Sequence, residues 1–497
     1  MTEPPRTFRP SRSGGGPNRP FQRGGGPQRG PTPHDPARDR AYRRVAKQAR
    51  RYPNELLITP LGEENLSPRD ASFAHALYDV TMRRWITLEF LVELGLKREF
   101  RSLDEHVRAA LLCGSAQMLL MNTIPPRAAI NESVTWTKRV TRSDRPGGFV
   151  NAGLRRVSEL IGQEPVEPVD ESGLEPVERP AKRWPPRLER YEHGQNELPL
   201  PDGRAMPLAH PVLPEDSLQR LAIATGHPLE LLRLWAKSMP LREVRALALH
   251  GIVRPPVILN TAHAQSDLPS DLTRAHTAPG HHVFTGTRPD LLALLEKRPD
   301  LWVQDPASSL AVESVTDLTP KLIVDACAGQ GTKTRQLAET FPDAKIVATD
   351  IDHQRRAALA EAFKGGPHSG RVSVIDFRQL SDWAGKADLV LLDVPCSNTG
   401  VLARRVEARY RATEANVAGL LGMQRQIMAD AVKLLAPGGA ILYSTCSLDP
   451  RENEEIVEWA SRWHGFESSR ADRRMPSGGP GEAPENYSDG SFAALLH

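Results

Sequence analysis

The chain has 497 residues, enough for about three domains, with 39% hydrophobic residues, 25% charged residues and a net charge of +3. This is the composition of a globular protein, and no apolar run approaches the roughly 20 residues that a membrane helix requires, which excludes a membrane partner. The opening MTEPPRTFRPSRSGGG lacks the apolar segment of a signal peptide, and the four cysteines lie far apart, so we predict a cytoplasmic protein with free thiols and no metal.

Residues 1–52 are rich in Arg, Gly and Pro and nearly free of acids and large aliphatic residues. Such a segment cannot bury enough apolar surface to offset the entropy of ordering, so we predict a disordered basic tail. Two roles remain open for it. It is either a solvated linker or a segment that attracts nucleic acid electrostatically, without sequence preference.

Residues 53–162 are predicted to form an all-α domain of about five helices. The stretch SPRDASFAHALYDVTMRRW offers Ser67 as a helix N-cap and Pro68 in the first turn, followed by apolar residues at three- and four-residue spacing. Arg83 and Arg84 within it are interpreted either as solvated side chains or as contacts to RNA.

Two further regions precede the last domain. Residues 163–213 are dense in Pro and charge without a sustained period, which predicts a long linker. Residues 214–298 predict a small α+β subdomain: amphipathic helices, with Gly251 as a helix stop, and then the strand-like RPPVILNTAH.

Residues 299–497 contain the segment KLIVDACAGQGTKTRQLAE, which predicts a strand ending at Asp325, a turn with Gly329 and Gly331, and a helix. Dinucleotide enzymes and methyltransferases both use such turns. The pyrophosphate fingerprint requires a third glycine where Thr334 stands, and the carboxylate of Asp325 suits the cationic methionine end of S-adenosyl-L-methionine. The motif therefore favours that cofactor over a dinucleotide, although an ordinary strand-to-helix turn remains open.

Two more acidic residues end predicted strands. Asp350 follows AKIVAT and is placed to accept both hydroxyls of a ribose, and Asp376 follows RVSVI, where a carboxylate commonly reaches an adenine amino group. Each alone would more often be a turn or cap residue. Three acids at successive strand ends favour a ligand site.

The next two predicted strands each deliver a cysteine to the same edge of the sheet. LVLLDVPCSNTG ends in Asp393 and Cys396, and AILYSTCS ends in Cys446. Cysteines in core strands are otherwise small buried hydrophobes.

The paired motifs DVPCSNTGVLARR and STCS closely resemble the signature of RNA cytosine-5 methyltransferases. In the helical region, SPRDASFAHALYDVTMRR, PPRAAINESV and GGFVNAGLRRV resemble the NusB-type domain that precedes the catalytic domain in bacterial rRNA cytosine-5 methyltransferases. The resemblance spans nearly everything after the basic tail. It implies an α/β catalytic domain of the Rossmann-like class I methyltransferase fold, with a mixed, mostly parallel sheet, behind an all-α NusB-like domain that binds RNA.

The activity implied by this resemblance is S-adenosyl-L-methionine-dependent methylation of carbon-5 of a cytosine in RNA, with small-subunit (16S) rRNA as the expected substrate. Cys446 would be the nucleophile that adds to carbon-6, and Cys396 would assist release of the product. Asp393 would bind the cytosine edge, and Lys333 would serve the substrate ring or the phosphate. Two alternatives remain open: an inactive RNA-binding ribosome-assembly factor, and a small-molecule methyltransferase of the same fold.

The resemblance also implies a set of cofactor contacts and a monomeric enzyme. The expected contacts are Asp325, Ala326, Cys327, Ala328, Gly329, Gln330, Gly331, Lys333, Asp350, Arg355, Asp376 and Asp393. The chain departs from the family at three places: Gln330 and Thr332 in the glycine turn, Ile258 where an Arg is common, and RRVEARY without the usual Pro.

Overall fold

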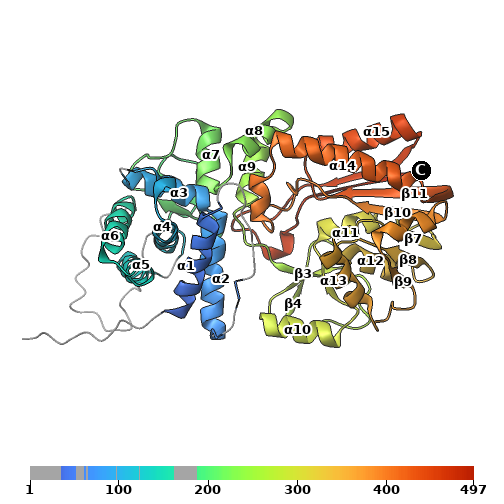
Figure 1. Ribbon diagram of the computed structural model, residues 1–497, viewed down its shortest axis with the longest axis horizontal. Coiled ribbons are helices and arrows are strands. Elements are labelled where there is room, and N and C mark those ends of the chain that lie inside the picture. The colour runs from blue at the N-terminus through green and yellow to red at the C-terminus, as the bar shows by residue number, and fades with distance from the viewer. Residues whose placement is uncertain (1–34, 52–60, 63–64, 97, 122–123, 162–186) are drawn as a thin grey trace, which may run out of the picture. The chain divides into compact units, whose positions relative to one another are not determined.

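The computed structural model describes residues 35–51, 61–62, 65–96, 98–121, 124–161 and 187–497 (Figure 1). The helices described in the N-terminal domain are α1 (Pro36–Ala49), α2 (Pro68–Arg83), α3 (Trp85–Gly95), α4 (Glu105–Leu119), α5 (Pro126–Thr141) and α6 (Asp144–Glu159), with a 3-10 turn η1 (Phe100–Ser102). Ser67 caps α2 as predicted, because its hydroxyl accepts a hydrogen bond from the Asp70 N–H at 3.1 Å. An all-α fold is confirmed for the described residues of this region.

Helix α1 corrects the prediction of a disordered tail through residue 52. Tyr42 and Val45 are buried in the core of the N-terminal domain, and the Tyr42 hydroxyl lies 2.8 Å from that of Ser133. The sequence PARDRAYRRVAKQA is rich in arginine, but its Ala, Tyr and Val residues recur at helical spacing and form one buried apolar face of the helix. Residues 1–34 and 52 of the predicted tail lie outside the described residues, and the chain divides into two units at Asp35 and Pro36.

The predicted linker is also partly structured. Strands β1 (Glu197–Pro199) and β2 (Ala205–Pro207) pair antiparallel, and Leu198 and Met206 are buried in the core of the N-terminal domain. A few apolar residues between prolines and charged residues are sufficient to form this hairpin, although the segment has no hydrophobic periodicity that predicts strands. Residues 163–186 of the predicted linker lie outside the described residues.

The small subdomain combines four helices with an antiparallel sheet of order β4-β5-β3-β6. Its elements are α7 (Ser217–Thr225), α8 (Leu229–Ser238), α9 (Leu241–His250), β3 (Val257–Asn260), β4 (Thr273–Ala275), β5 (His281–Phe284), α10 (Arg288–Lys297) and β6 (Trp302–Val303). Gly251 follows the last residue of α9, as predicted. Ile258 in β3 is buried against Ala403 and Tyr487, so the residue that replaces the family's common Arg packs in a core.

Arg83 and Arg84 are neither solvated nor placed to contact RNA, which corrects both interpretations. Arg84 is 2% exposed and donates hydrogen bonds to the carbonyls of Pro199 and Ala224 at 2.8 and 2.6 Å. Arg83 donates to the carbonyls of Gly251 and Ala403 at 3.2 and 2.6 Å. A guanidinium group carries several donors and can bond to backbone carbonyls of segments that are distant in sequence but meet in the fold. The local periodicity of the sequence cannot reveal such contacts.

The C-terminal domain is built on a seven-stranded sheet of order β12-β13-β11-β10-β7-β8-β9. Its strands are β7 (Leu322–Asp325), β8 (Lys345–Ala348), β9 (Val372–Val374), β10 (Ala387–Asp393), β11 (Leu435–Thr445), β12 (Ser468–Arg474) and β13 (Ser491–Leu496). The five strands β11, β10, β7, β8 and β9 are parallel to one another, whereas β13 runs antiparallel to both β11 and β12. This is the mixed, mostly parallel sheet that was predicted.

Helices cover both faces of this sheet (Figure 1). Helices α11 (Pro306–Glu313), α12 (Thr332–Thr340) and α13 (His353–Phe363) pack on one face, and α14 (Glu414–Val432) and α15 (Glu454–His464) pack on the other. Successive strand residues alternate between the two cores: Leu389 and Leu391 face the first, Val390 and Leu392 the second. The central strands β7, β8 and β10 are therefore largely buried on both sides and appear in the sequence as apolar runs, whereas the edge strand β12 is mostly exposed.

The connections place the expected site. From β7 the chain passes to β8 and β9 on one side, and then returns to β10 and β11 on the other. In such sheets ligands bind at the carboxyl ends of the strands where the order reverses, here between β7 and β10. Within the described ranges, no helix has both the length and the apolar character needed to cross a membrane.

Candidate active site

The turn after β7 requires its two glycines. Gly329 and Gly331 have φ values of +57° and +93°, and a Cβ on Gly331 would lie 2.7 Å from the Leu359 side chain of α13. A Cβ on Gly329 would meet nothing within 4 Å, so the turn has open space on that side. Gln330 and Thr332, the departures from the family pattern, therefore leave a Gly-x-Gly turn intact.

Asp325 lies beneath this turn with one oxygen unpartnered. Its Oδ2 accepts a hydrogen bond from the Thr334 hydroxyl at 2.7 Å, whereas its Oδ1 is buried and has no partner among the described residues. Burial raises the pKa of Asp325 to about 7, against the effect of the Thr334 hydrogen bond. Thr334, which stands in place of the third glycine, thus holds a carboxylate suited to a cation.

Asp350 and Asp376 end up in different settings. Both oxygens of Asp350 accept backbone N–H groups, Oδ2 from Gly329 at 3.0 Å and Oδ1 from Asp352 at 2.8 Å, so its carboxylate is fixed beside the glycine turn. Asp376 caps the 3-10 helix η3 (Phe377–Trp383) and forms an ion pair with Arg356 at 2.8 Å.

The remaining predicted cofactor contacts flank these acids. Ala326, Cys327, Ala328 and Gln330 belong to the same turn as the glycines, and burial raises the pKa of the Cys327 thiol. Arg355 is exposed on α13, while its neighbour Arg356 donates to the carbonyl of Asp350 as well as to Asp376. The sequence reasoning missed Arg356, since a single arginine on a helix gives no signal of its partners.

The two cysteines of the paired motifs meet. Cys396 follows β10, Cys446 follows the neighbouring β11, and their sulfur atoms lie 3.3 Å apart. The Cys446 thiol also donates to Oδ1 of Asn398 at 3.3 Å, and the Asn398 amide donates to the Cys396 carbonyl at 2.6 Å. Asn398 has a φ of +61°, a conformation that asparagine tolerates better than most residues, and the sequence reasoning had not singled it out.

Lys333 and Asp393 join the glycine turn to the cysteines. The Lys333 ammonium group forms an ion pair with Oδ2 of Asp393 at 2.8 Å, and the Asp393 side chain remains 35% exposed. Burial alone would lower the pKa of Lys333, but the charge of Asp393, with a smaller contribution from Cys446, raises it. The Lys333 ammonium group is therefore held beside Asp393 and close enough to Cys446 to interact with it electrostatically.

The loops at this edge of the sheet are fastened by charged residues that the sequence reasoning also missed. Arg404 donates to Asp489 at 2.5 Å and to Asp305 at 2.8 Å, which ties the loop after β10 to the segments before α11 and β13. Glu452, in the 3-10 helix η5 (Pro450–Glu452), is 0% exposed and accepts hydrogen bonds from both cysteine-bearing loops.

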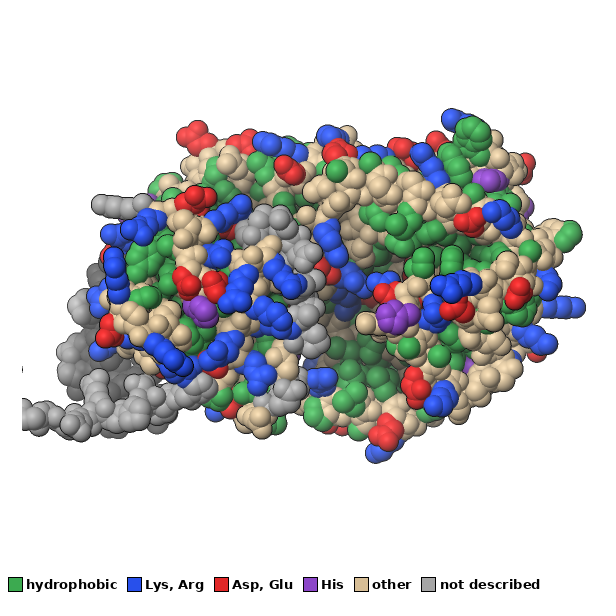
Figure 2. Space-filling model, in the orientation of Figure 1, with side chains coloured by type: hydrophobic (Ala, Val, Ile, Leu, Met, Phe, Trp, Pro, Cys, Tyr) green, Lys and Arg blue, Asp and Glu red, His purple; other side chains and the backbone are tan. Residues whose placement is uncertain are grey.

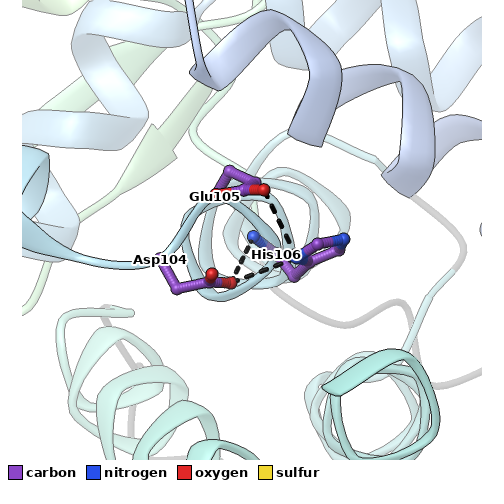
Figure 3. A group of neighbouring side chains, drawn as sticks. All are labelled: Asp104, Glu105 and His106. Atoms are coloured by element: carbon purple, nitrogen blue, oxygen red, sulfur yellow. Dashed lines mark hydrogen bonds and ion pairs between the residues drawn. The ribbon is translucent and has the colours of Figure 1, made fainter.

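Among the described residues, one group of side chains that could hold a metal ion lies at the N-terminus of α4, away from the glycine turn and the cysteines (Figure 3). Asp104 accepts from the backbone N–H of His106 at 2.9 Å and approaches its ring Nδ1 at 3.2 Å, and Glu105 forms an ion pair with Arg50 at 2.6 Å. Helix capping and ion pairing account for these side chains without an ion.

Comparisons with known proteins agree with this geometry. Residues 39–159 match the NusB family, and residues 315–479 match the family described as 16S rRNA methyltransferase RsmB/F. The ribosomal RNA small subunit methyltransferase B of Cronobacter sakazakii is 26% identical over 458 residues, covering 88% of this chain and 93% of that protein. The protein of the same name from Escherichia coli O127:H6 is 26% identical over 473 residues, covering 92% and 96%.

A solved structure shares the fold. The crystal structure of PH0851 covers 92% of this chain and 98% of its own, with a TM-score of 0.64 and 19% sequence identity. The order of the domains, the paired cysteines and the matched regions lead to one assignment: residues 315–479 form a catalytic region of the 16S rRNA methyltransferase RsmB/F family, and a NusB-family domain at residues 39–159 precedes it.

Proposed function

We propose that this enzyme methylates carbon-5 of a cytosine in small-subunit ribosomal RNA through a covalent adduct with Cys446. The observation that carries the proposal is the pair of thiols 3.3 Å apart at the ends of β10 and β11, beside Asp393 and the glycine turn. A small-molecule methyltransferase would leave the NusB-family domain without a role.

The residues around the turn fit S-adenosyl-L-methionine. The unpartnered Oδ1 of Asp325 suits the cationic methionine end, Asp350 suits the ribose hydroxyls, and Asp376 suits the adenine amino group. Ile351, 76% exposed next to Asp350, and Phe377, 42% exposed next to Asp376, add apolar surface for the adenine ring. When bound, this cofactor supplies a methyl group carried on a positively charged sulfur.

Cytosine carbon-5 is a poor nucleophile, and the cysteines overcome this. The Cys446 thiolate adds to carbon-6, which converts the ring into an enamine with a nucleophilic carbon-5. After methylation, Cys396 assists the elimination by accepting the carbon-5 proton. The electron pair of the carbon–hydrogen bond re-forms the double bond between carbon-5 and carbon-6, and the bond between carbon-6 and Cys446 breaks with its electrons returning to the sulfur. Asp393, held by Lys333, binds the N3 and N4 edge of the base as charge develops. The base must leave its stack to reach them.

Basic surface on the N-terminal domain supports an RNA partner. Arg43 and Lys47 of α1 and Arg50 just after it are exposed, and Figure 2 shows Lys and Arg side chains gathered over the helices of this domain. Such side chains attract phosphates without reading sequence. We propose that this face contacts the ribosomal RNA, and that the protein acts in the cytoplasm as a monomer.

Bisulfite sequencing of ribosomal RNA tests the function. A strain lacking the gene is expected to lose protection at a cytosine of the small-subunit rRNA, and a wild-type copy of the gene is expected to restore it. If no cytosine changes, the inactive assembly-factor alternative is favoured. Isothermal titration with S-adenosyl-L-methionine then separates the two, because an inactive factor of this kind would not bind the cofactor.

The pKa of Asp325 predicts how cofactor affinity depends on pH. At pH values below about 7 the free protein holds Asp325 protonated, and a cationic ligand must displace that proton. We therefore expect the dissociation constant of S-adenosyl-L-methionine to rise by up to about tenfold for each pH unit below 7, and to level off above it. Titration calorimetry between pH 5.5 and 7.5 measures this.

Asp325→Asn is expected to bind more weakly throughout and to lose this dependence. The ligand's own amino group titrates identically in both experiments, so the difference between the two proteins isolates Asp325. Asp343→Asn is the matched control, because Asp343 is exposed in the turn between α12 and β8. A wild-type affinity that stays constant over this pH range would refute the assignment of Asp325 to the cationic end.

A further inference from the structure

Glu452 is a fully buried acid that the chemistry above leaves without a task. It ends η5, six residues after Cys446, and is 0% exposed. Buried carboxylates are costly unless their oxygens are hydrogen-bonded, so the partners of Glu452 indicate what it stabilises.

Those partners come from the two cysteine-bearing loops and from α14. Oε2 accepts from the hydroxyls of Ser397 and Ser447, both at 2.5 Å. Oε1 accepts from the Ser397 backbone N–H at 2.9 Å and from the side-chain amide of Gln424 at 3.0 Å. These four donors occupy both oxygens of the carboxyl group.

The two serines are the residues that directly follow the two cysteines. Ser397 follows Cys396, Ser447 follows Cys446, and the two serine hydroxyls lie 3.0 Å apart. The same loops are joined again by the Gly400 N–H, which donates to the Cys446 carbonyl at 2.9 Å. A single carboxylate therefore bonds to the neighbour of each thiol, on loops about 50 residues apart in sequence.

We propose that Glu452 is a positioning residue that clamps the two cysteine loops together, so that the Cys446 and Cys396 thiols face the same cytosine. This inference rests on the proposed function and assigns to Glu452 no contact with the substrate. A reaction in which two side chains act on neighbouring atoms of the same base is sensitive to small displacements, because a shift of about 1 Å can lower the rate about 10²-fold.

The charge of Glu452 has a second effect on the pair. The pKa of Cys396 is raised, first by its hydrogen bond with Cys446 and then by burial, with smaller electrostatic contributions from Cys446 and Glu452.

Phenylarsine oxide tests the clamp without RNA, because trivalent arsenic binds two thiols that lie close together. We expect the wild-type protein to bind one arsenical through Cys396 and Cys446, and Cys446→Ala to lose this binding. Glu452→Ala is expected to bind it about tenfold more weakly, because the thiols are no longer held in register. Glu452→Gln keeps the shape of the side chain and one oxygen that can accept two hydrogen bonds. Its affinity for the arsenical is expected to lie between those of the wild type and Glu452→Ala.

Methyl transfer to RNA is then measured on the same variants. Glu452→Ala is expected to lower kcat by about 10²-fold while the affinity for S-adenosyl-L-methionine stays unchanged, with partial recovery in Glu452→Gln. Glu455→Gln is the matched control, an exposed glutamate three residues further on, and is expected to match the wild type. If Glu452→Ala unfolds, Glu452→Gln alone carries the comparison.

The outcomes separate the two proposals. The clamp would be overturned if Glu452→Ala bound the arsenical as tightly as the wild type, or if its kcat were unchanged. If the alanine variant unfolds, the same two criteria apply to Glu452→Gln. A protein that captures the arsenical in a Glu452-dependent manner but never methylates RNA would support the clamp and overturn the proposed function.

Discussion

Cys446→Ala is expected to abolish methyl transfer, with a loss of about 10⁴-fold or more, since removal of a covalent nucleophile leaves only binding and orientation. Such a loss corresponds to about 5 kcal/mol of transition-state stabilisation. The measurement is incorporation of a labelled methyl group into small-subunit rRNA. Cofactor affinity should remain at the wild-type value, because Cys446 follows β11 and the glycine turn follows β7.

The matched control for this variant is Cys113→Ala. Cys113 is a buried thiol of α4 in the core of the N-terminal domain, and its pKa is raised by burial, so it has no part in the chemistry. It should retain the wild-type rate once any loss of stability is allowed for. Full activity in Cys446→Ala would contradict the assignment and transfer the role of nucleophile to Cys396.

The central strands of the catalytic sheet were predictable because they are buried on both faces, whereas the mostly exposed β12 shows no apolar run and was not predicted. β7, β8, β10 and β11 appear in the sequence as short apolar runs that end in a polar residue, and in parallel sheets those ends share one edge. Asp325, Asp393 and the cysteines could therefore be grouped from the sequence. Their pairing at 3.3 Å follows from the adjacency of β10 and β11.

The residues that were missed act through partners distant in sequence. Glu452 lies in RENEEIVEW, where an acid looks like any residue at a helix start, and only the fold brings Ser397 to it. Arg83 and Arg84 looked like surface charge, yet their acceptors are carbonyls from residues 199 to 403. Composition misled at α1 for a related reason, because its buried Tyr42 depends on a pocket that α4 and α5 supply.

Cys396→Ala is expected to leave RNA covalently attached to the protein. Cys446 can still add to carbon-6 and carbon-5 can still be methylated, but elimination lacks the assisting thiol, so the adduct accumulates. A stable protein–RNA species should appear on denaturing gels in the presence of S-adenosyl-L-methionine, with turnover reduced by about 10²-fold or more.

The double variant Cys396→Ala/Cys446→Ala distinguishes this from non-specific crosslinking. If Cys446 forms the bond, removing it must abolish the attached species entirely, whereas a crosslink elsewhere would persist. Turnover at the wild-type rate by Cys396→Ala would exclude a role in release. The 3.3 Å contact between the thiols would then serve only to hold Cys446. An adduct that requires Cys446 and persists without Cys396 would establish separate roles for the two residues: the cysteine after β11 attacks the base, and the cysteine after β10 assists its release.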